Sequence, residues 1–133
     1  MPVTLGILTR YATPVPVLVW LILLWDRVTG RRPVRRSAPE QARVDGETVA
    51  LALYHFQACP YCRMVRRDLR LLALDVELRD IKRVHARRDE LVAGGGKKQV
   101  PCLRIVEPDG RVRWIYESAD ISRYLRARFA ATA

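Results

Sequence analysis

The pattern of apolar and polar positions divides the chain into three stretches. Residues 14–25 carry no charge, and this apolar stretch extends back to Leu5 with Arg10 as its only charged residue. The stretch that follows is polar, contains proline and shows no apolar period. After Thr48, short apolar runs alternate with amphipathic ones, as in a folded α/β domain. We therefore predict an anchor helix over residues 1–26, a basic polar tether over residues 27–47 and a folded domain over residues 48–133.

The alternation after Thr48 predicts the element order β-α-β-α-β-β-α. TVALALYHF is a short β-prone run and indicates a buried strand. PYCRMVRRDLRLLAL has apolar residues at near-helical spacing, with Pro60 in the first turn, where proline is favoured. The remaining predicted elements are a strand over 75–81, a helix over 84–96, a hairpin over 101–116 and a last helix over 118–130. This order predicts a four-stranded mixed sheet with helices packed on it.

The N-terminal apolar stretch has the length of a membrane-spanning helix. From Leu5 to Trp25 it contains about 21 residues, which at the helical rise just span a hydrocarbon core of roughly 30 Å. Trp20 and Trp25 suit a membrane interface. A cleaved signal peptide and a buried core helix are the alternatives, but the start lacks basic residues and no convincing cleavage site follows. The pattern favours an uncleaved, single-pass anchor in the inner (cytoplasmic) membrane, in contact with lipid.

Charge predicts the orientation of this helix and the class of partner. Five arginines follow Trp25, whereas only Arg10 precedes the core of the stretch, so the positive-inside rule places the folded domain in the cytoplasm. The net charge of +10 favours an anionic partner, such as nucleic acid, anionic lipid or a negatively charged thiol. The arginines at 63, 66, 67 and 70 have no aromatic residues interleaved among them and belong to no recognisable nucleic-acid-binding module. We therefore predict a solvated helix face there and no nucleic-acid partner.

The chain contains three cysteines, and two of them lie in the motif CPYC. A metal site needs further ligands, but Cys102, His55 and His85 form no second C-x-x-C or H-x-x-x-H pattern, so we predict no metal. The histidines fit packing or surface positions. A purely structural disulfide is disfavoured in the cytoplasm. Of metal binding, a structural disulfide and thiol redox chemistry, the pattern therefore favours thiol redox chemistry.

The position of the motif gives its two cysteines unequal chemistry. Cys59 ends the first strand and caps the first helix, so its sulfur faces the unpaired N–H groups of the helix start. Such a position lowers a thiol pKa from about 8.5 into the range of about 3.5–7.5. Cys62 lies one turn further in and is less exposed. The pair supplies one attacking thiolate and one resolving thiol, as thiol–disulfide exchange requires.

Three motifs in order carry a resemblance to a known family: CPYC after an apolar strand, KQVP before another strand, and ESADISRYL opening the last helix. Together they resemble the glutaredoxins, in particular the glutaredoxin-like N-terminal domain of glutathione transferases and of two-domain glutaredoxins. The resemblance covers roughly residues 49–130. It implies a thioredoxin-like fold, glutathione as co-substrate, Cys59 as the nucleophile and Cys62 as the resolving thiol.

The resemblance also implies a glutathione site formed by Tyr61, Lys98, Val100, Pro101, Glu117 and Ser118. In it, the Val100–Pro101 peptide bond is cis and the Val100 backbone pairs with the cysteinyl part of glutathione. Glu117 and Ser118 bind the γ-glutamyl end, and Ser118 also suits the N-cap of the last helix. Tyr61 lines the groove, and Lys98 meets the glycyl carboxylate.

The chain departs from the glutaredoxin pattern at three positions near the expected site. Phe56 stands where many glutaredoxins carry lysine, and Gln99 stands where many carry threonine. Cys102 directly follows Pro101, which brings a third thiol near the expected site. Its simplest interpretation is a small buried strand residue.

These observations predict a membrane-tethered, cytoplasm-facing thiol–disulfide oxidoreductase that uses glutathione to reduce mixed or protein disulfides. One alternative from another class is a non-enzymatic, glutathione-dependent carrier that holds an iron–sulfur cluster between two protomers. Pro60 and the second cysteine of the motif argue against it. Another alternative is a thiol–disulfide enzyme exported to the periplasm, which requires the arginine-rich flank to cross the membrane.

Overall fold

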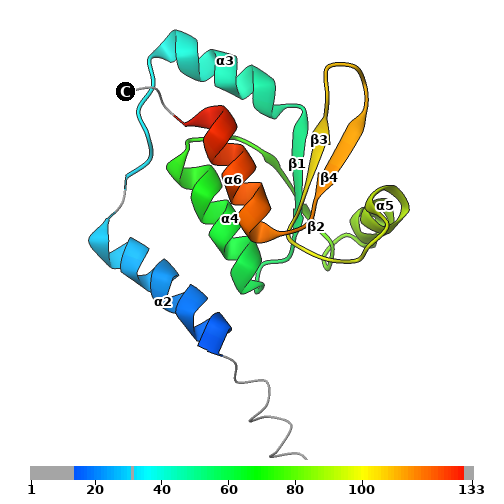
Figure 1. Ribbon diagram of the computed structural model, residues 1–133, viewed down its shortest axis with the longest axis horizontal. Helices are drawn as coiled ribbons and strands as arrows, with labels where there is room; N and C mark the ends of the chain where they lie inside the picture. Colours follow the sequence, from blue (N-terminus) through cyan, green and yellow to red (C-terminus); the bar gives the residue numbers. More distant parts are fainter. Residues whose placement is uncertain (1–13, 31, 131–133) are drawn as a thin grey trace, which may run out of the picture. The chain divides into compact units, whose positions relative to one another are not determined.

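The computed structural model describes residues 14–30 and 32–130 of the chain, which form parts of two separate units. The first unit contains helix α2 (Pro14–Thr29), and the second contains the other elements that the structure describes (Figure 1). In chain order, the second unit consists of α3 (Ala38–Thr48), β1 (Leu51–His55), α4 (Pro60–Leu71), β2 (Glu77–Asp80), α5 (His85–Gly95), β3 (Cys102–Val106), β4 (Val112–Ile115) and α6 (Ser118–Phe129).

The second unit is built on a four-stranded mixed sheet with the strand order β2-β1-β3-β4. β1 pairs with β2 in parallel, and the β1–β3 and β3–β4 pairs are antiparallel. Helices α4 and α6 pack on one face of the sheet, and α5 lies on the other (Figure 1). The predicted thioredoxin-like fold, including the mixed sheet and the order of its elements, is confirmed.

The central strand β1 is buried along its whole length because helices cover both faces of the sheet. Leu51 and Leu53 point into the larger core, where they join residues of α4 and α6 such as Val65 and Leu125. Tyr54, on the opposite face of the strand, joins Leu91 of α5 in a second core. The uncharged run that predicted a buried strand therefore contributes side chains to both hydrophobic cores.

Part of the segment predicted as a polar tether is the helix α3. Its N-cap is Ser37, whose hydroxyl accepts a hydrogen bond from the backbone N–H of Glu40 at 3.3 Å. This S-x-x-E pattern is a capping-box signature and was the available sequence signal for the helix. Val44 is 2% exposed and belongs to the larger core. A single buried apolar residue does not produce an apolar period, so the pattern alone did not show that α3 packs on the domain.

Arg36, just before α3, joins the ends of two helices that are distant in the sequence. Its guanidinium donates to the carbonyl oxygens of Leu72 at 2.6 Å and Phe129 at 2.5 Å, at the C-terminal ends of α4 and α6. Carbonyl groups there lack helical partners and carry the negative end of the helix dipole. Hydrogen bonds from a charged donor contribute about 1.5–3 kcal/mol each when well formed. The residues before α3 are therefore bound to the domain.

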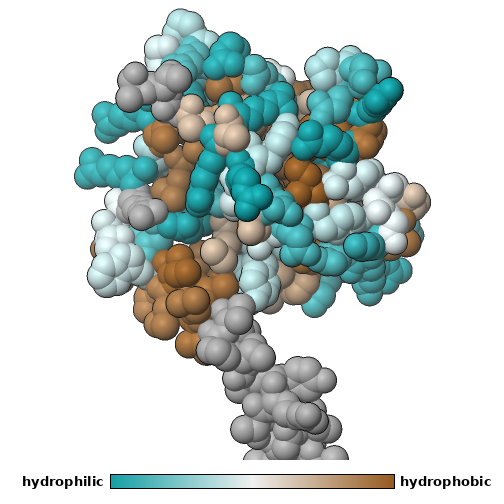
Figure 2. Space-filling view, in the orientation of Figure 1, coloured by the Kyte–Doolittle hydropathy of each residue, from teal (hydrophilic) through white to brown (hydrophobic). Residues whose placement is uncertain are grey.

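Helix α2 does not support the predicted membrane anchor. It has 16 residues and spans roughly 24 Å at 1.5 Å per residue, less than a hydrocarbon core of roughly 30 Å. It also includes Asp26 and Arg27, although many of its apolar side chains are exposed (Figure 2). No helix in the described ranges is long and apolar enough to cross a membrane. This finding contradicts the predicted single-pass location in the inner membrane; residues 5–13 of the predicted span lie outside the described residues.

Candidate functional site

The CPYC motif forms the start of α4, directly after the short loop that follows β1. Cys59 is the N-cap, with extended backbone angles (φ −71°, ψ 120°), and Pro60 is the first helical residue. Proline suits this position because its fixed φ matches a helix and its missing N–H is not needed there. The Sγ of Cys59 accepts a hydrogen bond from the backbone N–H of Cys62 at 3.4 Å. The predicted N-cap position of Cys59 is confirmed.

The two thiols of the motif have opposite pKa shifts. A hydrogen bond from the Cys62 thiol is the largest cause that lowers the pKa of Cys59 to about 6, and the backbone N–H groups of Cys62 and Tyr61 add to it against the cost of burial. The pKa of Cys62 is raised because its proton bonds to Cys59 and because the side chain is buried. At neutral pH, Cys59 is therefore mainly a thiolate, and Cys62 remains a thiol.

Arg66 is part of the site, although the sequence pattern placed it on a solvated helix face. Its guanidinium reaches back from α4 to the loop after β1, donating to the carbonyl oxygens of Gln57 at 3.0 Å and Phe56 at 3.3 Å. It also lies 2.7 Å from Nδ1 of His55. His55 is buried, and burial followed by the charge of Arg66 lowers its pKa, so it is a neutral acceptor. The i, i+4 spacing of Arg66 from Cys62 was the available signal.

The Val100–Pro101 peptide bond is cis, as the resemblance implied. It directly precedes β3, whose first residue, Cys102, pairs with Tyr54 near the end of β1. Because β1 continues into the loop that leads to Cys59, the register brings the cis-proline segment to the same end of the sheet as the two motif cysteines. Pro101 is buried, and Val100 is partly exposed.

The start of α6 lies at this same end of the sheet, because β4 runs antiparallel to β3 and ends opposite its beginning. Glu117 is exposed and is the N-cap of α6, although its side chain makes no capping bond. The N-cap is therefore Glu117 and not Ser118, which is the first residue of the helix. The amide of Gln99, beside the cis-proline, donates to the Glu117 carboxylate at 3.4 Å. Lys98 and Tyr61 are both exposed.

Tyr116 hydrogen-bonds to the loop that carries the cis-proline. The sequence pattern predicted only that this residue belongs to a strand. Its hydroxyl donates to the carbonyl oxygen of Lys97 and accepts from the N–H of the same residue, both at 3.3 Å. A Cβ on Gly95 would lie only 1.8 Å from this hydroxyl, so the close approach of α5 requires glycine there. Tyr116 therefore fixes the chain just before the residues predicted to bind glutathione.

The third thiol, Cys102, is fully buried at the start of β3. Burial raises its pKa to about 12, and a hydrogen bond with Tyr116 only partly offsets this shift. Cys102 is therefore a neutral thiol at physiological pH, as expected of a small buried strand residue. Nearby, Nζ of Lys82 lies 4.0 Å from the centre of the Phe56 ring, so a positive charge lies beside the position where many glutaredoxins carry lysine.

All three cysteines are free thiols. Among the described residues, no group of three or more histidine, cysteine or acidic side chains is placed to hold a metal ion.

The mixed sheet, the paired cysteines at the start of α4 and the cis-proline define a thioredoxin-like domain. Residues 53–133 match the family described as glutathione S-transferase, N-terminal domain. The match covers more than half of the sequence, and the chain belongs to this family. The sequence resemblance to the glutaredoxin-like domain of glutathione transferases is thus confirmed at the level of this family. None of the curated proteins compared with the chain is a significant match.

Several solved structures are similar to part of the chain. Maleylacetoacetate isomerase from Anaeromyxobacter dehalogenans is 30% identical over 63% of this chain and 38% of its own, with a TM-score of 0.48. A structure of that isomerase with GSH bound in the active site is 29% identical over 63% of this chain and 39% of its own, also with a TM-score of 0.48. Glutathione transferase E6 from Drosophila melanogaster is 28% identical over 62% of this chain and 36% of its own, with a TM-score of 0.49. The chain thus spans less than two-fifths of the length of these proteins.

The pKa of Cys59 predicts how its reactivity depends on pH. A thiol with a pKa of about 6 is already mostly thiolate at pH 7, so alkylation of Cys59 by iodoacetamide should rise with pH around a midpoint near 6 and level off by about pH 7.5. Peptide mass spectrometry after timed labelling of the reduced protein measures the rate at each cysteine. Cys62→Ala should move the midpoint upward, because it removes the thiol donor. A midpoint near 8.5 in the parent protein would contradict the thiolate assignment.

Proposed function

We propose that this domain is a glutathione-dependent thiol–disulfide oxidoreductase that reduces mixed or protein disulfides through Cys59 and Cys62. The observation that carries the proposal is the pair of unequal thiols at the start of α4, a stabilised thiolate beside a buried, protonated thiol. Thiol–disulfide exchange needs this combination of an attacking and a resolving sulfur. Membership of the glutathione S-transferase N-terminal domain family supports glutathione as the co-substrate.

With a glutathionylated protein as substrate, the Cys59 thiolate attacks the glutathione sulfur. A bond forms between Cys59 and glutathione, the mixed disulfide breaks, and the protein thiolate leaves and takes up a proton. A second glutathione thiolate then attacks the bound glutathione sulfur, which releases glutathione disulfide and restores the Cys59 thiolate. In sum, one molecule of glutathione is consumed, its sulfur joins the glutathionyl sulfur taken from the substrate as glutathione disulfide, and the protein thiol is recovered.

With a protein disulfide as substrate, Cys59 attacks one of its sulfurs and Cys62 resolves the adduct. Cys62 loses its proton as it attacks Cys59, the second substrate thiol leaves, and the Cys59–Cys62 disulfide remains. Two glutathione molecules then reduce this disulfide and are joined as glutathione disulfide. Arg66 is placed to hold the loop beside the two sulfurs throughout, because it bonds to the backbone of Phe56 and Gln57.

Glutathione is proposed to lie along the end of the sheet that carries the cis-proline. The Val100 backbone before Pro101 pairs with the cysteinyl part. The exposed carboxylate of Glu117 meets the γ-glutamyl ammonium, and Ser118 with the N–H groups at the start of α6 meets the γ-glutamyl carboxylate. Tyr61 beside the motif lines the groove, and the exposed Lys98 reaches the glycyl carboxylate.

A transferase or isomerase reaction of glutathione is the second candidate, and family membership favours it. In such a reaction the sulfur of bound glutathione is the nucleophile, and Cys59 would only hydrogen-bond to it. Cys62 would then have no role as a resolving thiol. The two candidates therefore differ in what each motif cysteine contributes to turnover.

Substitution of the two motif cysteines separates these functions. Cys59→Ser should abolish reduction of a glutathionylated peptide, because no other thiol in the site has a lowered pKa. Cys62→Ser should retain a measurable part of the parental rate of reduction, since free glutathione resolves the adduct on Cys59. Turnover is followed as glutathione disulfide production coupled to glutathione reductase. Retention of full disulfide reduction by Cys59→Ser would contradict the proposed function.

Glu117→Ala tests how glutathione is bound. Loss of one charge-assisted contact costs on the order of 1.5–3 kcal/mol, so the KM for a glutathionylated peptide should rise roughly 10- to 100-fold. The alkylation midpoint of Cys59 and its reaction with a small uncharged disulfide should stay unchanged. Asp120→Ala, which removes an exposed carboxylate in the same first turn, is the matched control. A Glu117→Ala protein with the parental KM would contradict the binding assignment but not the redox one.

A further inference from the structure

A pocket lies on the α5 face of the sheet, on the opposite side from α4 and its cysteines. Its volume is about 370 Å³, within the range of pockets that hold small molecules. The side chains that line it come from all four strands and from α5: Tyr54, Arg79, Arg87, Glu90, Arg104 and Trp114. Three guanidinium groups therefore face this pocket with only one carboxylate among its lining residues.

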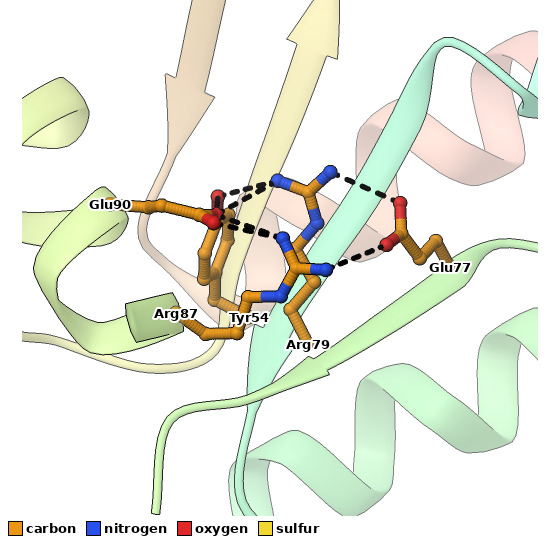
Figure 3. A network of polar contacts seen from close by, with 5 residues as sticks. All are labelled: Tyr54, Glu77, Arg79, Arg87 and Glu90. Atoms are coloured by element: carbon orange, nitrogen blue, oxygen red, sulfur yellow. Dashed lines mark hydrogen bonds and ion pairs between the residues drawn. The ribbon is translucent and has the colours of Figure 1, made fainter. Parts of the chain in front are cut away.

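Two of these arginines belong to a closed ring of ion pairs. Arg79 of β2 pairs with Glu77 at 3.1 Å and Glu90 at 3.2 Å, and Arg87 of α5 pairs with the same two carboxylates at 3.5 and 2.8 Å (Figure 3). The hydroxyl of Tyr54 accepts from Arg79 at 2.8 Å and donates to Glu90 at 3.0 Å. Each group restrains its neighbours, so both guanidinium groups have fixed positions in the pocket wall.

Arg104 is the guanidinium that this ring leaves unmatched. It is partly buried on the central strand β3, and within the described part of the chain it has no carboxylate at ion-pair distance and no hydrogen-bond acceptor for its side chain. Its cation–π contact is with the ring of Trp114, whose centre lies 5.9 Å from Cζ, and its charge also acts on Glu77 from beyond ion-pair distance, where it adds to the lowering of the pKa of that carboxyl by Arg79 and Arg87. The ring of ion pairs matches two arginines with two glutamates. The charge of Arg104 is therefore the one positive charge at the pocket that these two glutamates do not balance.

We propose that this pocket binds a small anion bearing a carboxylate or phosphate group, and that Arg104 is the residue that pairs with it. The planar guanidinium presents parallel N–H donors that match two oxygens of either group. The adjacent ring of Trp114 supplies an apolar wall for the part of the ligand next to the anionic group. The ligand class is thus a compact organic carboxylate or phosphate.

The pocket wall is rigid enough to bind such a ligand without rearrangement. A Cβ on Gly94 would lie 2.3 Å from the Trp114 ring, so α5 approaches this ring as closely as glycine permits. Trp114 also packs against Tyr54, with ring centres 5.6 Å apart. Preorganised side chains lose little conformational freedom on binding, which favours affinity in a small site.

Titration followed by NMR tests this proposal. The indole N–H signal of Trp114, assigned with Trp114→Phe, is recorded while benzoate or inorganic phosphate is added at constant ionic strength. We expect a saturable shift with at least one of these probes and none with benzamide, the neutral counterpart of benzoate. Which anion binds more tightly distinguishes a carboxylate ligand from a phosphate ligand.

Variants of Arg104 decide whether the shift reports this site. Arg104→Gln should weaken binding at least about tenfold, and Arg104→Lys should weaken it less because the charge is kept. Arg111→Gln, in the exposed β3–β4 turn, is the matched control and should bind like the parent. No saturable shift with either anion would overturn the proposal, as would equal binding by the parent and Arg104→Gln. Because the readout does not involve the cysteines, the result is independent of the proposed redox function.

Discussion

The hydrogen bonds that the Cys59 sulfur accepts from the thiol and the backbone N–H of Cys62, at the start of α4, are the interactions on which the proposed chemistry depends. This arrangement exists because a short loop leads from β1 to Cys59 at the N-cap of α4, and because Pro60, which has no N–H group, is suited to the first helical position. The same bond network that stabilises the Cys59 thiolate keeps the proton on Cys62. A single helix start thus creates two thiols of different reactivity from two identical residues.

The two faces of the sheet have different parts in holding this site. On the α4 and α6 face, a continuous apolar core fixes both helices, and Arg36 bonds to their C-terminal carbonyl groups. On the other face, α5 is fixed by ion pairs and by the close approach of Gly95 to Tyr116, which holds Lys97. The first face therefore positions the motif cysteines, and the second positions the chain that leads to the cis-proline.

Most of the fold followed from the sequence because its elements have local signals. The buried run at β1, the near-helical spacing after Pro60 and the predicted hairpin over residues 101–116 indicated the element order and the sheet type. Contacts between distant elements carried weaker signals or none. The i, i+4 spacing placed Arg66 beside Cys62 but did not show that it reaches back to the loop after β1, and nothing local showed that the hydroxyl of Tyr116 bonds to Lys97, 19 residues away. The predicted anchor failed for a different reason. A long apolar run was taken to define one helix, but the helix described over it has 16 residues and includes two charges at its end.

We propose that Cys59 exchanges disulfides with glutathione and that Cys62 resolves the product. The most direct measurement is the mass of the reduced protein after brief exposure to glutathione disulfide, with peptide mapping of any adduct. We expect an intramolecular Cys59–Cys62 disulfide in the parent protein. In Cys62→Ser, we expect one glutathione on Cys59 and none on the buried Cys102. An unmodified Cys59 in both proteins, or an adduct found only on Cys102, would contradict it.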